Sequence, residues 1–142
     1  MTPSGVPEVQ HTLITGGAGF IGSHLAERLL GRGERVVVID DFSTGSRDNL
    51  AAVAEHPNLT VMESDIATCP ELDRIVAGSS YVFHLAAAVG VDLVVQSPIR
   101  TIETNLKCTE AILEAAAPTL TPLLLPSSSE VYGKSTRESF DE

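Results

Sequence analysis

The segment Thr15–Leu25, TGGAGFIGSHL, constrains the fold of this chain more than any other stretch of its sequence. It contains the pattern Gly-x-Gly-x-x-Gly, starting at Gly17, and the overlapping pattern Gly-x-x-Gly-x-x-Gly, starting at Gly16. The short apolar run His11–Thr15 precedes the glycines, and apolar residues at helical spacing follow them. This order predicts a buried strand, a tight glycine turn and a helix.

An acidic pair follows the second apolar run. Arg35–Ile39 (RVVVI) predicts another buried strand, and Asp40, which comes next, lies 18 positions after Gly22. A glycine turn followed at this distance by an acidic residue is typical of a dinucleotide site: the helix N-terminus binds the pyrophosphate, and the carboxylate accepts from the ribose hydroxyls. Asp40 and Asp41 would repel a 2′-phosphate and so favour NAD over NADP, although Arg47 could offset their charge. The alternative is a glycine-rich turn that binds no ligand.

The rest of the chain alternates between the two kinds of element. Further strands are predicted at Leu59–Glu63, Tyr81–His84 and Thr121–Leu125, and helices at Phe20–Arg32, Asp48–Ala54, Pro70–Ala77 and Pro98–Ala117. Such alternation implies right-handed crossovers and a parallel sheet. The predicted fold class is α/β, a Rossmann-type doubly wound parallel sheet with strand order 3-2-1-4-5. Residues 1–10 are expected to form a flexible N-terminus, and residues 11–142 the dinucleotide-binding domain.

Composition narrows the function classes. The 142 residues carry a formal net charge of -10 with a pI near 4.7, which disfavours binding to nucleic acid. No apolar run is long enough for a transmembrane helix, so no membrane partner is expected. Cys69 and Cys108 are far apart in sequence, so neither a metal site nor a disulfide scaffold is predicted, and a cytoplasmic location fits.

Polar or small residues follow each later strand, and ligands bind at the carboxyl ends of parallel strands. They are Asp65-Ile66 after the third strand, Leu85-Ala86-Ala87 after the fourth, and Ser127 to Glu130 after the fifth. Ordinary loop packing is the alternative for each group. Three further residues, His24, His84 and Cys108, are predicted to be packed residues rather than catalysts.

These segments together resemble the N-terminal part of an extended short-chain dehydrogenase/reductase of the NAD-dependent epimerase/dehydratase group, which acts on nucleotide sugars. The resemblance is carried by TGGAGFIGSHL, DDFSTG (Asp40–Gly45), HLAAAVGV (His84–Val91), the helix Thr101–Ala116 and SSSEVYG (Ser127–Gly133). It is closest to UDP-glucuronate decarboxylases and sugar 4-epimerases.

The resemblance implies roles for individual residues. Gly16, Gly19, Phe20 and Ile21 would bind the pyrophosphate; Asp40, Asp41, Ser43, Thr44 and Gly45 the adenosine; Asp65 and Ile66 the adenine; and Leu85, Ala86 and Ala87 the ribose and phosphate. Asn105 would lie near the bound NAD, Ser128 would hydrogen-bond the sugar hydroxyl that is oxidised, and Ser129 and Glu130 would transfer protons.

The implied activity is transient oxidation of a nucleotide sugar, with a UDP-sugar expected, usually at carbon 4, followed by epimerisation, decarboxylation or dehydration. A homodimer is expected for the complete enzyme. The rival interpretation is a non-catalytic dinucleotide-binding module or a natural truncation.

The sequence departs from the family pattern in two places. Cys108 replaces the glycine of the Asn-x-x-Gly-Thr motif. The Tyr-x-x-x-Lys pair that removes the hydroxyl proton is absent, because Leu85 follows Tyr81 at that spacing and Thr136 follows Tyr132. The chain is therefore expected to lack the substrate-binding part and to be inactive alone.

Overall fold

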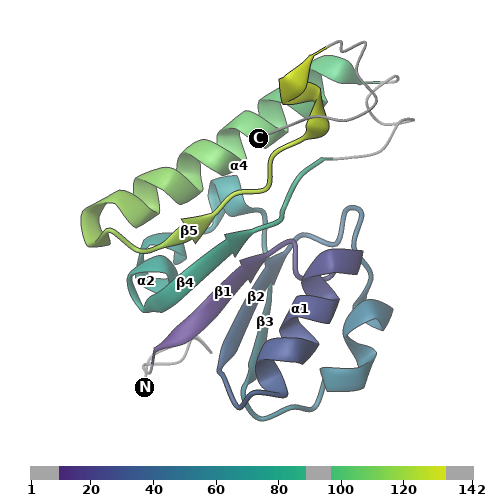
Figure 1. The fold of residues 1–142 in the computed structure, drawn as a ribbon, viewed down its shortest axis with the longest axis vertical. Helices are drawn as coiled ribbons and strands as arrows, with labels where there is room; N and C mark the ends of the chain where they lie inside the picture. Colours follow the sequence, from purple (N-terminus) through teal and green to yellow (C-terminus); the bar gives the residue numbers. More distant parts are fainter. Residues whose placement is uncertain (1–9, 89–96, 134–142) are drawn as a thin grey trace.

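Five parallel strands form the centre of the fold (Figure 1). This computed structural model describes residues 10–88 and 97–133, without the side chains of Ser129 and Glu130. The strands are β1 (His11–Thr15), β2 (Val36–Asp40), β3 (Leu59–Glu63), β4 (Ser79–His84) and β5 (Leu123–Leu124). Their order is β3-β2-β1-β4-β5, as predicted. The predicted flexible N-terminus lies outside the described residues except for Gln10.

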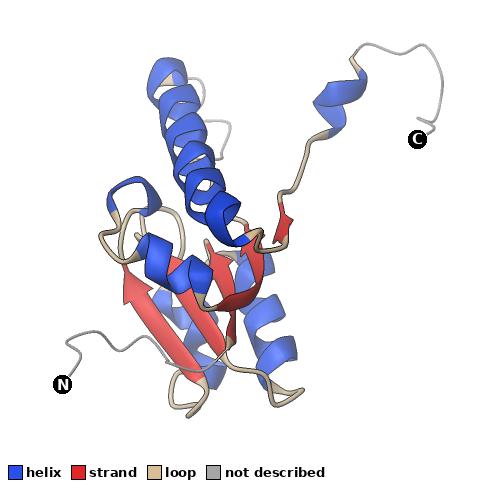
Figure 2. Cartoon of the chain, turned by 90° about the vertical axis from the view of Figure 1, so that its left-hand side faces the viewer, coloured by secondary structure: helices blue, strands red, loops and turns tan. Residues whose placement is uncertain are grey.

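Helices cover both faces of the sheet (Figures 1 and 2). The α-helices are α1 (Phe20–Leu30), α2 (Leu72–Ala77) and α4 (Pro98–Ala116). Short 3-10 helices are η1 (Arg47–Val53), η2 (Ile66–Thr68), η3 (Ala117–Thr119) and η4 (Ser129–Tyr132). No helix in residues 10–88 or 97–133 is long and apolar enough to span a membrane.

Two apolar clusters follow from the alternation of side chains along each strand. On β1, Leu13 joins a cluster with residues of α2 and α4, whereas the next residue, Ile14, joins a cluster with residues of α1 and η1. Strands buried on both faces explain why β1 and β2 appear in the sequence as continuous apolar runs.

The predicted elements differ from the observed ones mainly at their ends. Helix α1 ends at Leu30, because the N–H groups of Gly31 and Gly33 bond to carbonyls of the last turn. The helix expected at Asp48–Ala54 is the 3-10 helix η1. Strand β5 has only two residues because Pro122 and Pro126, which cannot donate to a ladder, stand close to its ends.

The turn between β1 and α1 packs closely against the backbone that follows β4. Gly16 has φ +69°, and a Cβ atom there would stand 2.6 Å from the backbone nitrogen of Ala86, just beyond β4. Gly22 lies in the first turn of α1, six positions after Gly16, and a Cβ there would stand 2.4 Å from the carbonyl oxygen of Gly16. The glycines thus allow β1, β4 and α1 to approach one another at the carboxyl edge of the sheet.

We expect Gly16→Ala to lower the free energy of unfolding by roughly 3 kcal/mol or more, because left-handed strain adds to a clash with backbone atoms. Gly33→Ala is the matched control. Gly33 also has a positive φ, +81°, but a Cβ there meets no atom within 4 Å. Strain alone should cost that variant about 1–2 kcal/mol. Urea unfolding of both variants measures the difference, and equal losses would contradict the close approach to Ala86.

Candidate functional site

A cavity of about 770 Å³ lies across the carboxyl edge of the sheet. Every residue that the resemblance assigned to NAD lines it, and so does Ser128. Its walls come from the segments that follow β1, β2, β3, β4 and β5 and from one side of α4. No Lys or Arg is found among the described residues of this lining. An anionic ligand here would therefore be held by N–H and O–H donors rather than by cationic side chains.

The N-terminus of α1 provides one group of donors. Gly19 caps this helix in an extended conformation, without a side-chain hydrogen bond to the first turn, and that turn contains no acidic residue. The side chains of Phe20 and Ile21 are 78% and 69% exposed and line the cavity. Free N–H groups and the helix dipole make such an end suitable for a phosphate.

Asp40 connects the glycine turn to the end of β2. Its Oδ2 atom accepts a hydrogen bond from the N–H of Ala18 at 2.8 Å, and its Oδ1 atom accepts from the N–H of Phe42 at 2.8 Å. The residue is buried, with 7% exposure. Each carboxylate oxygen has a second lone pair, so the carboxylate can position the turn and still accept from a ligand hydroxyl.

Asp41 and Arg47 lie close to Asp40 at the surface. Asp41 is exposed, and its Oδ1 atom accepts from both the N–H and the hydroxyl of Ser43. The Arg47 guanidinium pairs with Glu63 and lies 4.3 Å from the centre of the Phe42 ring. The partner of Arg47 in the structure is thus Glu63.

Cys108 is a packed residue, as predicted, and it also lines the cavity. Its Sγ atom lies 3.9 Å from Oδ1 of Asp65, the same oxygen that accepts from the N–H of Ala67 and caps η2. Burial, together with the negative charge of Asp65, raises the pKa of the Cys108 thiol. The departure from the family glycine therefore places a neutral thiol in the wall beside the residues assigned to adenine.

Asn105 fixes the segment that follows β4. Its Oδ1 atom accepts from the N–H of Ala88 at 2.7 Å, and its Nδ2 group donates to the Ala88 carbonyl at 3.2 Å. At the other end of the segment, the N–H of Leu85 donates to the carbonyl of Thr15 at 3.0 Å. Asn105 therefore ties the cavity wall to α4 through two bonds to one residue.

The predicted catalytic residues follow β5. Ser127 and Ser128 are exposed and line the cavity, which brings them to the same site as Asp40 although β5 and β2 are separated by two strands. Ser129 and Glu130 belong to η4, and their side chains are outside those described.

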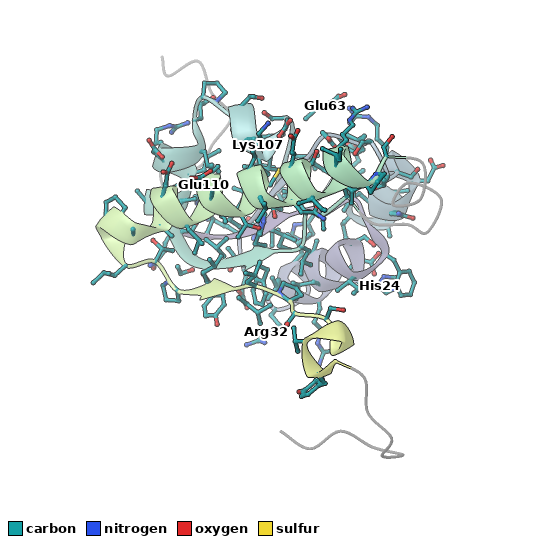
Figure 3. The ribbon with its side chains drawn as sticks, turned by 90° about the horizontal axis from the view of Figure 1, so that it is seen from above. His24, Arg32, Glu63, Lys107 and Glu110 are labelled. Carbon is teal, nitrogen blue, oxygen red and sulfur yellow. The ribbon has the colours of Figure 1, made fainter. Side chains whose placement is uncertain are left out.

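Two of the four histidines, His24 and His84, were predicted to be packed, and the structure places them differently. The prediction that His24 is packed was wrong: the side chain is exposed on α1 and its ring lies 4.8 Å from that of Phe20 (Figure 3). His84 is buried, as predicted, but it also lines the cavity, as do Thr104 and Thr109 of α4. The position of His84 at the carboxyl end of a strand was the one sequence signal for this. The threonines gave none, because helical periodicity does not show which residues border a cavity.

Comparison with known proteins places this geometry in a family. Residues 13–142 match the sequence profile of GDP-mannose 4,6 dehydratase. The chain belongs to this family, and thereby to the NAD-dependent epimerase/dehydratase group of extended short-chain dehydrogenases/reductases, of which it covers the N-terminal part. The predicted resemblance is confirmed.

Individual relatives show the range of the family. The chain is 37% identical over 121 residues to UDP-glucuronic acid decarboxylase 1 of Arabidopsis thaliana, covering 85% of this chain and 27% of the relative. It is 41% identical over 124 residues to a UDP-N-acetyl-alpha-D-glucosaminuronate decarboxylase of Bacillus cytotoxicus, covering 87% and 38%. The chain thus spans about a quarter to two fifths of these curated relatives.

Solved structures share the fold. A dTDP-glucose 4,6-dehydratase from Streptomyces venezuelae, determined with NAD bound, superposes with a TM-score of 0.84 at 33% identity, covering 92% of this chain and 43% of that one. A UDP-N-acetylglucosamine 4-epimerase from Methanobrevibacter ruminantium gives 0.84 at 32% identity, covering 96% and 43%.

We expect Asp40→Asn to destabilise the chain by about 1–3 kcal/mol. Each carboxylate oxygen of Asp40 now accepts a hydrogen bond from a backbone N–H, and in the variant one of these oxygens is replaced by an amide nitrogen, which cannot accept. Asp41→Asn removes the same charge, but the remaining carbonyl oxygen can keep both bonds to Ser43. That control should stay within about 0.5 kcal/mol of the parent chain. Urea unfolding without cofactor tests the pair, and equal stabilities would show that Asp40 does not hold the turn.

Proposed function

We propose that this chain is the NAD-binding part of an NAD-dependent nucleotide-sugar epimerase, decarboxylase or dehydratase, with a UDP-sugar as its substrate. The observation that supports this most strongly is the single cavity lined both by the residues assigned to NAD and by Ser128. The names of the relatives, which are decarboxylases, dehydratases and epimerases of nucleotide sugars, support the substrate class.

The residues present fit a dinucleotide. Gly16 and Gly22 keep the turn free of side chains, and the uncapped N-terminus of α1 offers donors for the pyrophosphate. At the β2 end, the buried Asp40 carboxylate is suited to the adenosine ribose hydroxyls. The cavity volume is in the range of known cofactor pockets.

We assign the first chemical step to the β5 end of the cavity. When bound, NAD supplies a hydride acceptor for the sugar carbon. The Ser128 hydroxyl would hold and orient the sugar hydroxyl, and Ser129 and Glu130 would take part in later proton transfers. A serine hydroxyl alone is too weak a base to remove the proton near neutral pH. Since the 142 residues contain no Tyr-x-x-x-Lys, we propose that they bind NAD without turning over a sugar.

We expect the chain to bind NAD at least about tenfold more tightly than NADP in calorimetric titrations, because Asp40 and Asp41 repel a 2′-phosphate. Arg47, whose charge could offset these carboxylates, is paired with Glu63. The Asp41→Asn variant should narrow the ratio of the two affinities. Glu55→Gln, which removes an equal charge from the exposed segment before β3, is its control and should leave the ratio as it is.

The possible outcomes of this titration separate two claims. Equal binding of NAD and NADP would contradict the assigned preference alone. Binding of neither dinucleotide would contradict the proposed function of the cavity.

The outward side of α4 supports a further part of the proposal, a homodimer. Ile99, Ile102, Leu106 and Leu113 recur at helical spacing and are between 48% and 73% exposed. Part of α4 extends beyond the ends of the strands (Figure 2). An apolar stripe of this kind is characteristic of a protein–protein contact, and we propose that a second copy of the protein covers it.

We therefore expect the chain to dimerise at micromolar concentration and Leu106→Glu to keep it monomeric, because a carboxylate would have to be buried in the contact. Lys107→Gln is the control on the same helix (Figure 3), and it should dimerise like the parent, because Lys107 is not one of the apolar residues of the stripe and pairs with Glu103. Sedimentation velocity distinguishes the species. A parent chain that remains monomeric would contradict the proposed interface.

A further inference from the structure

The hydroxyl of Thr15 joins two groups at the carboxyl edge of the sheet. Thr15 is fully buried at the end of β1. Its Oγ1 atom accepts a hydrogen bond from the N–H of Ala86 at 3.2 Å and lies 2.7 Å from Nδ1 of His84. The two bonds reach the last residue of β4 and the segment that follows it, so one side chain determines how the His84 ring is turned and where the Ala86 peptide lies.

This arrangement determines which ring nitrogen of His84 carries the proton. The Ala86 N–H can only donate, so Oγ1 is its acceptor, and the single hydroxyl proton of Thr15 remains to be placed. Among the described residues, Nδ1 of His84 is the acceptor within hydrogen-bond distance of that hydroxyl. A proton on Nδ1 would leave the buried Thr15 hydroxyl with no acceptor. Nδ1 therefore accepts, and Nε2 carries the hydrogen.

The Nε2 atom of His84 has no hydrogen-bond partner among the described residues. His84 is 2% exposed, lines the cavity, and makes no hydrogen bond through Nε2 to any residue in the described ranges. Within those ranges, every side-chain nitrogen or oxygen that is fully buried has a partner. Nε2 is therefore not fully buried, and it belongs to a side chain that lines the cavity. Burial also lowers the pKa of His84, which keeps the ring neutral and preserves this tautomer near pH 7.

An uncharged hydrogen-bond donor at the end of β4 suits a ligand that carries oxygen acceptors. The described lining contains no Lys or Arg, so oxygen atoms of a ligand depend on N–H and O–H groups. The N-terminus of α1 supplies donors beside β1, and His84 supplies one at the end of β4, the neighbouring strand.

We propose that His84 contacts the ligand: its Nε2–H donates a hydrogen bond to an oxygen in the phosphate–ribose part of the bound dinucleotide, and Thr15 holds the ring in the tautomer that can donate. This inference rests on the proposed function of the cavity. It adds a binding residue to those that the family resemblance assigned, and it gives Thr15 a positioning role.

Two substitutions separate contact with the ligand from a purely structural role. In His84→Asn, the amide reaches only as far as Nδ1, so its oxygen can still accept from Thr15 but no donor reaches the cavity. In His84→Gln, the amide reaches as far as Nε2 and can restore an N–H group there. Calorimetry with NAD on the 142-residue chain should show binding weakened about three- to tenfold by His84→Asn. His84→Gln should recover most of that loss.

The result that would overturn the proposal is a parent chain that binds NAD and a folded His84→Asn variant that binds it equally tightly. Thermal unfolding followed by circular dichroism identifies variants that are not folded. If the parent chain binds no NAD, the proposed function fails first, and the two failures are therefore distinguishable.

A second measurement does not depend on the variants. In NMR spectra of chain labelled with ¹⁵N at histidine, His84 should show a protonated Nε2 and an unprotonated Nδ1 without ligand, and the Nε2–H signal should shift when NAD is added. A proton on Nδ1, or a signal unchanged at saturating NAD, would overturn the proposal.

Discussion

The hydrogen bond from the Ala18 N–H to the Asp40 carboxylate holds together the part of the molecule on which the rest of the site depends. Ala18 is fully buried in the turn between β1 and α1, and its carbonyl accepts from the backbone of Ser46 and the side chain of Asn49. The turn is therefore tied to the end of β2 and to the start of η1. Its glycines can approach β4 closely because this position is fixed.

The pyrophosphate of NAD carries two negative charges, the chain has a net charge of -10, and the described residues of the cavity lining include no Lys or Arg. Uncharged hydrogen-bond donors that point at the phosphate oxygens can bind such a group without a cation. Amide groups at the start of α1 and the neutral ring of His84 can stabilise anionic oxygens, and they do not attract the carboxylates of Asp40, Asp41 and Asp65 as a lysine would. Arg47, a cation near this site, is paired with Glu63.

The same scaffold occurs in relatives named as decarboxylases, dehydratases and epimerases, so this fold alone does not select among their reactions. One departure from the family pattern lies among the described residues. Cys108 stands where the family motif has a glycine, and it brings a thiol to within 3.9 Å of Asp65 in the cavity wall. The structure accommodates it because its side chain belongs to the apolar cluster formed by residues of the sheet, α2 and α4.

The sequence by itself determined the fold class, the strand order and the residues that directly follow the strands at the cavity, because each depends on local patterns: apolar runs, glycine spacing and the ends of strands. It did not show that Thr104 and Thr109 of α4 line the cavity. The sequence predicted the ends of β5 less well, because prolines shorten this strand. It also wrongly predicted that His24 is packed, because a helix that packs one side against a sheet leaves its other side exposed. Only the tertiary structure decided that Asp40 binds Ala18, that Glu63 engages Arg47, and that Thr15 orients His84. Each of these pairs joins residues far apart in the chain, and their contact depends on strand register and on the close approach at Gly16, which no local pattern records.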